Sequence, residues 1–398
     1  MIPVHKIVVP TPYRVGPVNA YLLASRPYTL VDPGPDTPQA REVLQGELER
    51  LGVPLDRIER VLLTHFHSDH SGLARWVYTM TGAKIHIHPY DLRKLNPAYD
   101  FVGVRLPFVR EAGMPSGFVD SVLKDRDKLP WPWVPDGSAI SVDDGYELSF
   151  ERGILKAFHF PGHATGHLCF YDPEGENFLS GDFLLPHITP NPFLEPDPLC
   201  PERRTPSLRH YLEGLDRLEK MNIKRVWPGH GEVIDDIRRV VIMAREHHRL
   251  RFEALLDLVR KNGRRTAFEI SRLMYPDLEG FDIFMGLSEV LAHLDVLVDR
   301  GRQRKDARRP GLADICSGKS TKNTGRFSNR FLLPIHPLPA ENQTHQSTFY
   351  PPHWYPAGNA LPQQLPEHHF TGHRFQAVIQ RKCARAPVAA LGGLKPGQ

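Results

Sequence analysis

The sequence predicts a layered α/β domain over residues 1–235, and two kinds of pattern support this fold class. Short apolar runs of the β type alternate with amphipathic helical runs through this part of the chain. In Ser71–Met80 the apolar side chains recur at i, i+3, i+4 and i+7, which is one face of a helix. Thr205-Pro206 is a helix-start signal, and an apolar stripe follows it to Leu218. Strands and helices mixed in this order are typical of a sheet covered by helices.

The expected strands are short, apolar and bounded by turn-forming residues. They are Asn19–Ser25, Tyr28–Val31, Ile58–Thr64, Lys84–His88, Ile154–Phe160, His167–Tyr171, Asn177–Leu184 and Lys224–Trp227. Between Asp91 and Gly137 the alternation stops, and aromatic residues stand among prolines and glycines. A long irregular stretch inside a domain is usually a functional loop. We interpret this one as a lid with an apolar wall beside a site, with a packed insertion as the alternative.

Three helical patterns follow in residues 236–304, and an Arg-rich segment that we interpret as a hairpin ends them. The patterns are Asp236–Asn262, Ala267–Tyr275 and Ile283–Arg300. They predict a small helical or winged-helix-like module. Because the last helix is acidic and apolar rather than basic, we expect it to serve dimerisation or to flank a site, rather than to bind DNA.

Residues 305–398 show no sustained periodicity and hold few acidic residues. We expect a disordered tail, because too little apolar surface could be buried there to offset chain entropy. The abrupt change in composition also raises the hypothesis of a frameshifted or read-through translation. Nothing in the sequence positions the tail histidines, which we interpret as incidental: His353, His368, His369 and His373.

The composition is typical of a soluble globular protein, with 40% hydrophobic and 24% charged residues. We see no signal peptide and no apolar run of about 20 residues, so we expect a cytoplasmic protein that does not cross a membrane. The net charge of +4 derives from the basic tail and gives little support to nucleic-acid binding. The cysteines show no CxxC and no pairing rhythm, which argues against a disulfide framework and a cysteine zinc site: Cys169, Cys200, Cys316 and Cys383.

The strongest chemical signal is HFHSDH at residues 65–70, between an expected strand and an expected helix. On extended backbone alternate side chains point the same way, which brings His65 and His67 toward one metal ion. Asp69 and His70 follow after the chain turns and can serve a neighbouring ion. Imidazole and carboxylate are ligands that Zn²⁺, Fe²⁺ and Mn²⁺ accept. A solvated polar loop would not need this density of ligands.

Four such ligands cannot complete two coordination spheres, so further ligands must follow other strands. His163 in Pro-Gly-His, Asp182 in Ser-Gly-Asp and His230 in Pro-Gly-His each come directly after an apolar run. The glycine in each motif lets the backbone approach closely. We therefore predict that these three side chains join the residues 65–70 cluster.

With HxHxDH, PGHxxGH, SGD and PGHG in this order, residues 1–235 resemble the metallo-β-lactamase superfamily. The resemblance implies an αββα sandwich with a metal site at one edge between its two sheets. It also implies two ions, with zinc as the leading choice and iron or manganese as alternatives. The implied ligands are His65, His67 and His163 for the first ion, Asp69, His70 and His230 for the second, and Asp182 bridging both.

Departures from the family pattern narrow the activity that the resemblance implies. Dinuclear zinc β-lactamases commonly have cysteine where this chain has Asp182, and flavodiiron proteins carry glutamate where it has His67. The helices after residue 235 are similar to the winged-helix appendage of lactamase-like hydrolases related to glyoxalase II. We therefore expect hydrolysis of a small-molecule ester or thioester.

Two divalent ions that share a water lower its pKa toward about 7, so a hydroxide becomes available at neutral pH. We expect Asp69 to orient the second ion and to accept the proton. His167 either donates a proton to the leaving group or only holds a neighbouring loop. Asp32, in VDPG, either orients a ligand imidazole or forms a turn.

Two other functions stay open. An endoribonuclease or phosphodiesterase with the same ions would need a basic groove, for which the nearby arginine pairs are candidates. A mono-iron oxidoreductase resembling persulfide dioxygenases would use His65, His163 and Asp182. A homodimer is compatible with either. The arginine pairs are Arg203-Arg204, Arg238-Arg239 and Arg264-Arg265.

Overall fold

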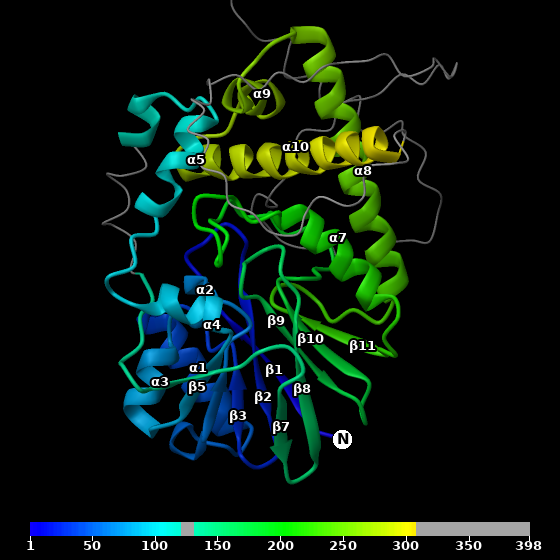
Figure 1. Ribbon diagram of the computed structural model, residues 1–398. Coiled ribbons are helices and arrows are strands. Elements are labelled where there is room, and N and C mark those ends of the chain that lie inside the picture. Colours follow the sequence, from blue (N-terminus) through cyan, green and yellow to red (C-terminus); the bar gives the residue numbers. More distant parts are fainter. Residues whose placement is uncertain (121–130, 308–398) are drawn as a thin grey trace, which may run out of the picture. The chain divides into compact units, whose positions relative to one another are not determined.

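Two β-sheets form the centre of the computed structural model, which describes residues 1–120 and 131–307. The first sheet has the order β1-β2-β3-β4-β5-β6 and the second β11-β10-β9-β8-β7 (Figure 1). The strands of the first sheet are β1 (Val4–Val9), β2 (Val18–Leu23), β3 (Thr29–Val31), β4 (Arg60–Leu62), β5 (Lys84–Ile87) and β6 (Ala139–Ser141). Those of the second are β7 (Glu147–Phe150), β8 (Gly153–His159), β9 (Leu168–Asp172), β10 (Asn177–Gly181) and β11 (Arg225–Pro228).

Helices cover the outer face of each sheet (Figure 1). The described α-helices are α1 (Pro38–Arg50), α2 (Ser68–Ser71), α3 (Ala74–Thr81), α4 (Pro89–Leu92), α5 (Leu106–Glu111), α7 (Ser207–Leu218), α8 (Ile237–Asn262), α9 (Ala267–Met274) and α10 (Phe281–Ala307). Single 3₁₀ turns are η1 (Leu55–Arg57), η2 (Arg93–Leu95) and η3 (Gly103–Arg105). The side chain of Thr37 accepts a hydrogen bond from the backbone N–H of Ala40 and so caps α1.

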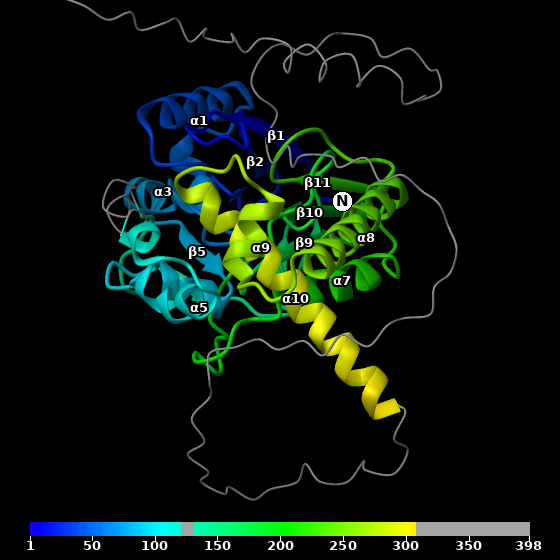
Figure 2. The ribbon, with the colours of Figure 1, turned by 90° about the horizontal axis from the view of Figure 1, so that it is seen from above.

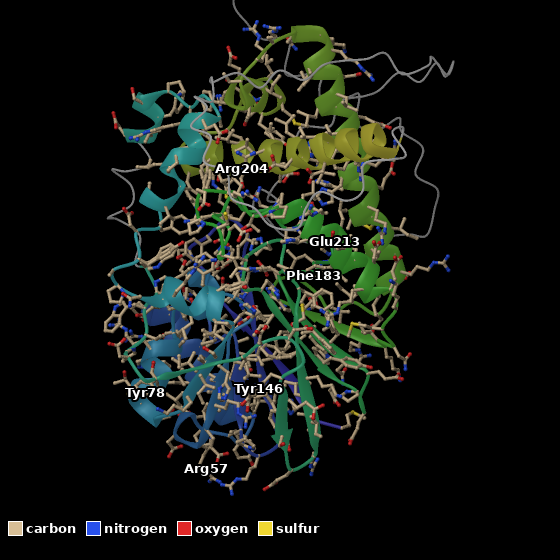
Figure 3. All side chains as sticks on the ribbon, in the orientation of Figure 1. Arg57, Tyr78, Tyr146, Phe183, Arg204 and Glu213 are labelled. Carbon is tan, nitrogen blue, oxygen red and sulfur yellow. The ribbon has the colours of Figure 1, made fainter. Side chains whose placement is uncertain are left out.

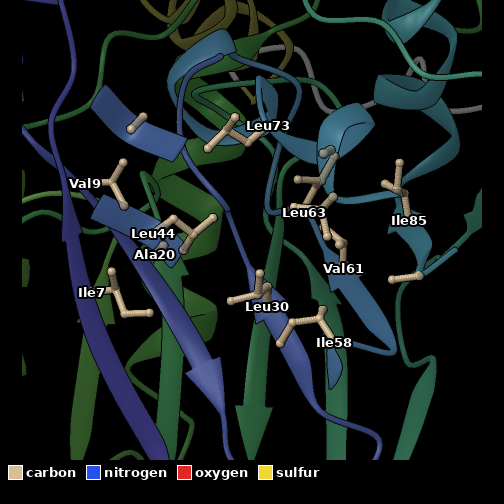
Figure 4. Close-up of a cluster of buried hydrophobic side chains, with 14 of the residues drawn as sticks. Ile7, Val9, Ala20, Leu30, Leu44, Ile58, Val61, Leu63, Leu73 and Ile85 are labelled. Atoms are coloured by element: carbon tan, nitrogen blue, oxygen red, sulfur yellow. The ribbon is translucent and has the colours of Figure 1, made fainter. Parts of the chain in front are cut away.

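Side-chain alternation along the strands explains the four layers. In β2, Leu22 packs with the helices on the outer face, whereas Leu23 packs between the sheets. In β4, Val61 likewise packs with the outer helices, and Leu62 packs between the sheets. Figure 4 shows the outer cluster, in which Leu44 of α1 meets the strands of the first sheet. The predicted αββα sandwich is therefore confirmed.

The expected strands are all present, with shifted ends. The sequence did not predict β1, β6, β7 and the short helix α2, and the expected helix Ser71–Met80 corresponds to α3. Residues 91–137 were expected to be irregular, but their described part contains α5 and two 3₁₀ turns. The expected Arg-rich hairpin is also wrong within the described residues, because α10 continues as a helix to Ala307.

The three helices predicted after β11 are present as α8, α9 and α10, and the described residues of this part contain no strand pair that could make a wing. That they form a separate module stays a prediction. The side chains of α5, α8, α9 and α10 share one apolar cluster with Phe193. Figures 1 and 2 show these four helices near one another. Asn191 Nδ2 donates to the carbonyl of Met285 (3.1 Å), and Ser288 Oγ donates to the carbonyl of Pro192 (3.1 Å). Helix α10 is thus bonded directly to the loop at residues 191–193. The boundary at residue 235 stays a prediction, and most of the predicted tail lies outside the described residues.

No helix in residues 1–120 and 131–307 combines the length and the apolar character that crossing a bilayer needs. The cytoplasmic location stays a prediction.

Candidate metal centre

Three imidazoles meet where β4 and β8 end. His65 Nε2 lies 2.9 Å from His67 Nδ1, and His163 Nε2 lies 3.0 Å from the same His67 atom. His65 is fully buried and His163 is 8% exposed. Nitrogen lone pairs that face one another this closely need a proton or a cation between them. The three ring nitrogens therefore form a ready ligand group.

A second group lies beside the first. Asp69 Oδ2 is 3.4 Å from His230 Nε2 and 3.8 Å from His70 Nε2. The two histidines are 5% or less exposed. One carboxylate and two imidazoles again form a ligand set that suits a divalent cation.

Asp182 lies between the two groups and turns one carboxylate oxygen toward each. Its Oδ2 is 3.6 Å from His163 Nε2, in the first group. Its Oδ1 is 3.4 Å from His70 Nε2 and 3.7 Å from His230 Nε2, in the second group. The seven side chains singled out from the sequence thus converge at one place.

Strand ends bring the ligands together. The histidine-rich loop follows β4, His163 follows β8, Asp182 follows β10 and His230 follows β11. Gly181 stands before Asp182 with φ +48°, and a Cβ there would lie 2.6 Å from Oγ1 of Thr64. Only glycine fits this close approach between the two ligand loops.

Asp32 orients two of the ligand imidazoles. Its Oδ2 accepts from Nδ1–H of His70 (2.9 Å) and from the Thr64 hydroxyl (2.6 Å). Because that hydroxyl donates to Asp32, its oxygen accepts from Nδ1–H of His65 (3.0 Å). Both rings therefore turn a bare Nε2 toward the centre. Asp32 has φ +49°, so it also makes the expected turn, and a non-glycine residue in this strained region is typical of functional sites.

Backbone carbonyls orient two further rings. Nδ1–H of His163 donates to the carbonyl of Asn191 (3.0 Å), and Nδ1–H of His230 donates to the carbonyl of Pro17 (2.8 Å). In each ring the other nitrogen, Nε2, faces the centre. Metal-binding histidines are held in this way, with the second nitrogen bonded to a carbonyl or a carboxylate.

Three of the ligand atoms that face the centre have no hydrogen-bond partner. His70 Nε2, His230 Nε2 and Asp182 Oδ1 are buried and make no hydrogen bond. Burial alone would raise the pKa of Asp69, but His70 and His230 hold it at about 2. Burial would likewise lower the pKa of His70, but Asp182, Asp69 and Asp32 raise it well above its ordinary value. The site is thus built to hold positive charge, and its donor set fits two divalent ions.

His167 does not face the centre in a way that would let it donate a proton to a leaving group. Its ring is fully buried, and its Nε2 accepts from the backbone N–H of Asp182 (3.2 Å). The ring also stacks on His65, with centroids 5.0 Å apart. Of the two roles that the sequence left open, these contacts favour holding a neighbouring loop.

A cluster of buried charges supports the ligand loops from behind. Lys94 is 1% exposed, and its ammonium donates to Asp91 Oδ1 (2.8 Å), Thr165 Oγ1 (2.7 Å) and Glu195 Oε1 (2.7 Å). Arg105, 2% exposed, donates to the same Glu195 oxygen (2.9 Å). The two cations and the two carboxylates, Asp91 and Glu195, balance in charge. Burial acts to raise the pKa of both acids, and Lys94 acts to lower it. Lys94 and Arg105 hold the pKa of Glu195 at about 2.

The acids of this cluster bind the backbone of both histidine loops. Asp91 accepts from the N–H of Phe66 (3.2 Å) and of Gly166 (3.0 Å), and Glu195 accepts from the N–H of Thr165 (2.9 Å). The cluster therefore fixes the loop of His67 against that of His163. The sequence did not predict this cluster. The only local signal was the Asp-Lys pair at i, i+3, which is ordinary on exposed helices.

Aromatic rings form a wall beside the first group. The rings of Phe66 and Phe193 lie 4.5 Å and 5.3 Å from that of His67, centroid to centroid. Phe101 and Trp131 pack against Phe66 at 6.3 Å and 5.7 Å. The apolar wall expected from the 91–137 segment is therefore present, with Phe193 added to it. Its contact with a substrate stays a prediction.

Comparison with known proteins agrees with this geometry. The model of the metallo-beta-lactamase superfamily matches residues 13–230. The chain belongs to this superfamily. The probable metallo-hydrolase YqjP of Bacillus subtilis is 29% identical over 297 residues, which cover 73% of this chain and 90% of that protein. A metallo-beta-lactamase family protein from Thermus thermophilus, solved by crystallography, is 30% identical with a TM-score of 0.64 and covers 75% of this chain and 94% of that one.

The name of a more distant relative states its substrate. An atrochrysone carboxyl ACP thioesterase of Aspergillus fumigatus is 26% identical over 185 residues, or 46% of this chain and 42% of that protein. Together with the superfamily match, these relatives identify the chain as a metal-dependent hydrolase.

Proposed function

We propose that this protein hydrolyses a thioester or ester of a small molecule with two divalent ions, zinc by first choice. The observation that carries the proposal is the placement of Asp182, whose two oxygens face two separate ligand groups. His65, His67 and His163 would hold one ion. Asp69, His70 and His230 would hold the other, and Asp182 would contact both.

When bound, such a pair lowers the pKa of water toward about 7 and polarises a carbonyl oxygen. The side chain of Asp69 is 14% exposed, more than the histidines of its group, so solvent can reach it, and we assign it the role of proton acceptor. Asp32 and His167 would contact the ligand residues rather than the ions. Asp32 keeps Nε2 of His65 and His70 bare, and His167 holds the backbone of Asp182.

The surroundings favour an acyl group as substrate. Phe101 and Trp131 are partly exposed and pack on the buried ring of Phe66 beside His67, so they offer an apolar surface there. The thioesterase relative acts on an acyl carrier substrate, as its name states, and this supports a thioester over a simple ester.

The structure favours phosphodiester cleavage less. Arg204, labelled in Figure 3, is paired with Asp295 of α10 at 2.5 Å and with Glu111 at 3.6 Å. Arg265 is paired with Glu269 at 3.4 Å. Each of these two guanidiniums has an acidic partner on the protein, which leaves less positive charge for a phosphate backbone.

The proposal is tested with purified full-length protein, its metal content and a panel of substrates. We call the two ligand groups together with Asp182 the strand-end site. We expect about two metal ions in this site, and turnover of acyl-pantetheine thioesters well above that of bis(p-nitrophenyl) phosphate. Chelation should abolish turnover, and Zn²⁺ should restore it. His67→Ala should lose metal from the first group.

Full turnover by a metal-free preparation would overturn the mechanism. Faster cleavage of the phosphodiester would overturn the substrate class but keep the ions. A single bound iron with oxygen consumption would favour the persulfide-dioxygenase alternative.

A further inference from the structure

Helices α8 and α10 meet at a second buried cluster of histidines and a carboxylate. His247 and His248 belong to α8, and Glu289 and His293 belong to α10. His248 and Glu289 are each 1% exposed and His293 is 2% exposed. None of these residues belongs to the strand-end site.

Hydrogen bonds fix which nitrogen of His248 is bare. Nδ1–H of His293 donates to the backbone carbonyl of Glu289 at 2.8 Å, which leaves its Nε2 as an acceptor. That atom lies 3.2 Å from Nδ1 of His248, which must therefore carry the proton. Nε2 of His248 is then an unprotonated nitrogen, and it has no hydrogen-bond partner. His293 thus orients His248 as Asp32 orients His70 in the strand-end site.

The carboxylate of Glu289 is unsatisfied in the same way. Both of its oxygens are buried without a hydrogen-bond partner, and so is Nε2 of His247. Nδ1 of His293 lies 3.7 Å and Nε2 of His247 lies 4.0 Å from Oε1, both beyond hydrogen-bond distance. Burial raises the pKa of Glu289 to about 7, even though Arg251 acts to lower it. A buried carboxylate without a hydrogen bond is costly, so it must take up either a proton or a cation.

We propose that His247, His248 and Glu289 bind a zinc-type divalent cation between α8 and α10. Their ligand atoms all lie within 4.8 Å of one another. Two imidazoles and one carboxylate are a usual protein ligand set for Zn²⁺, with one position left for water. The three residues come from two helices, so the ion fastens α8 to α10.

The ion supports the strand-end site without touching a substrate. Helix α10 is bonded to Asn191 and Pro192 through Met285 and Ser288. The carbonyl of Asn191 in turn orients His163. Fixing α10 against α8 therefore steadies the loop that positions a ligand of the first group.

The test compares the metal content of full-length wild type and Glu289→Gln after dialysis against the same zinc buffer. Glu246→Gln is the matched control, because Glu246 lies on α8 but is exposed and paired with Arg249 at 2.6 Å. We expect Glu289→Gln to hold one ion fewer per chain than both wild type and the control. Added Zn²⁺ should also raise the melting temperature of the wild type more than that of Glu289→Gln.

The test depends on the difference in metal ions per chain between the variants, not on the total number of ions in each protein. Ions in the strand-end site or on tail histidines are common to all three proteins, so a failure of the proposed function leaves this test intact. Should Glu289→Gln not fold, His247→Gln replaces it, because the His247 side chain is 32% exposed. Equal metal content in all variants would overturn the proposal and identify Glu289 as a protonated, purely structural acid.

Discussion

The strand-end site and the α8–α10 cluster are both made of buried histidines and carboxylates, but different backbone carries them. In the first, loops after four strands and the short helix α2 bring seven ligands together, and the Asp69 side chain is 14% exposed. In the second, three ligands project from two helices, and Glu289 is closed off at 1% exposure. Loops at strand ends can aim ligands at a substrate, whereas helices hold them against each other. We therefore assign catalysis to the strand-end site, and to the α8–α10 cluster the role of holding the two helices together.

The largest effect is expected from Asp182→Asn. Neutralising the residue that faces both ligand groups should lower kcat/KM by roughly 10³-fold or more, because the ligands act as one unit. Glu289→Gln, which changes the same charge in the other cluster, should leave kcat/KM within about a few-fold. Steady-state kinetics on a thioester substrate measures both. Equal losses would contradict the division of roles.

A large loss of stability is expected from Lys94→Met. The change removes the cation that Asp91 and Glu195 share, and breaking a buried ion pair from one side costs roughly 3–5 kcal/mol. The control is Lys156→Met, whose pair with Glu147 (2.8 Å) is 39% and 50% exposed and is worth about 0–1 kcal/mol. Urea unfolding measures both. A similar small effect from the two variants would show that the charge cluster does not hold the ligand loops.

The sequence predicted the strand-end site well because its ligands follow strands. Residues at the ends of neighbouring strands meet whatever the length of chain between them, and glycine before His163, Asp182 and His230 marked the close approach. The same alternation predicted the two-sheet fold. It missed β6 because none of its three residues is buried, and β7 because only Leu148 and Phe150 of it are buried.

Long-range charge pairing could not be predicted. Lys94 and Glu195 are separated by 101 positions, and both residue types are normally exposed. The α8–α10 cluster could not be predicted from the sequence for a related reason. His247, His248 and Glu289 fall within ordinary amphipathic helices, where no spacing distinguishes a ligand from a core residue. The helix register that brings them together comes from the apolar packing of α8 and α10.

A moderate effect is expected from Asp32→Asn. The change weakens the acceptor that keeps Nε2 of His65 and His70 bare, and losing such a partner lowers metal affinity by roughly 10–100-fold. Competition with a zinc chelator measures the affinity. Asp36→Asn is the control, because Asp36 lies nearby but pairs with Arg75 at 3.5 Å. Unchanged affinity in Asp32→Asn would mean that the backbone alone orients the two rings.

The smallest effect on catalysis is expected from His293→Phe, which makes the corresponding change in the α8–α10 cluster. Phenylalanine fills much of the same space but cannot accept from Nδ1–H of His248, so Nε2 of that ring is no longer fixed as the bare nitrogen. Zinc affinity at this cluster should fall by roughly tenfold, while metal in the strand-end site stays unchanged. Because the ion fastens helices and meets no substrate, kcat should hold near wild type at 25 °C, and the loss should appear as a lower melting temperature in zinc buffer. A lower kcat at full stability would instead mean that α10 transmits the state of this cluster through Asn191 to His163.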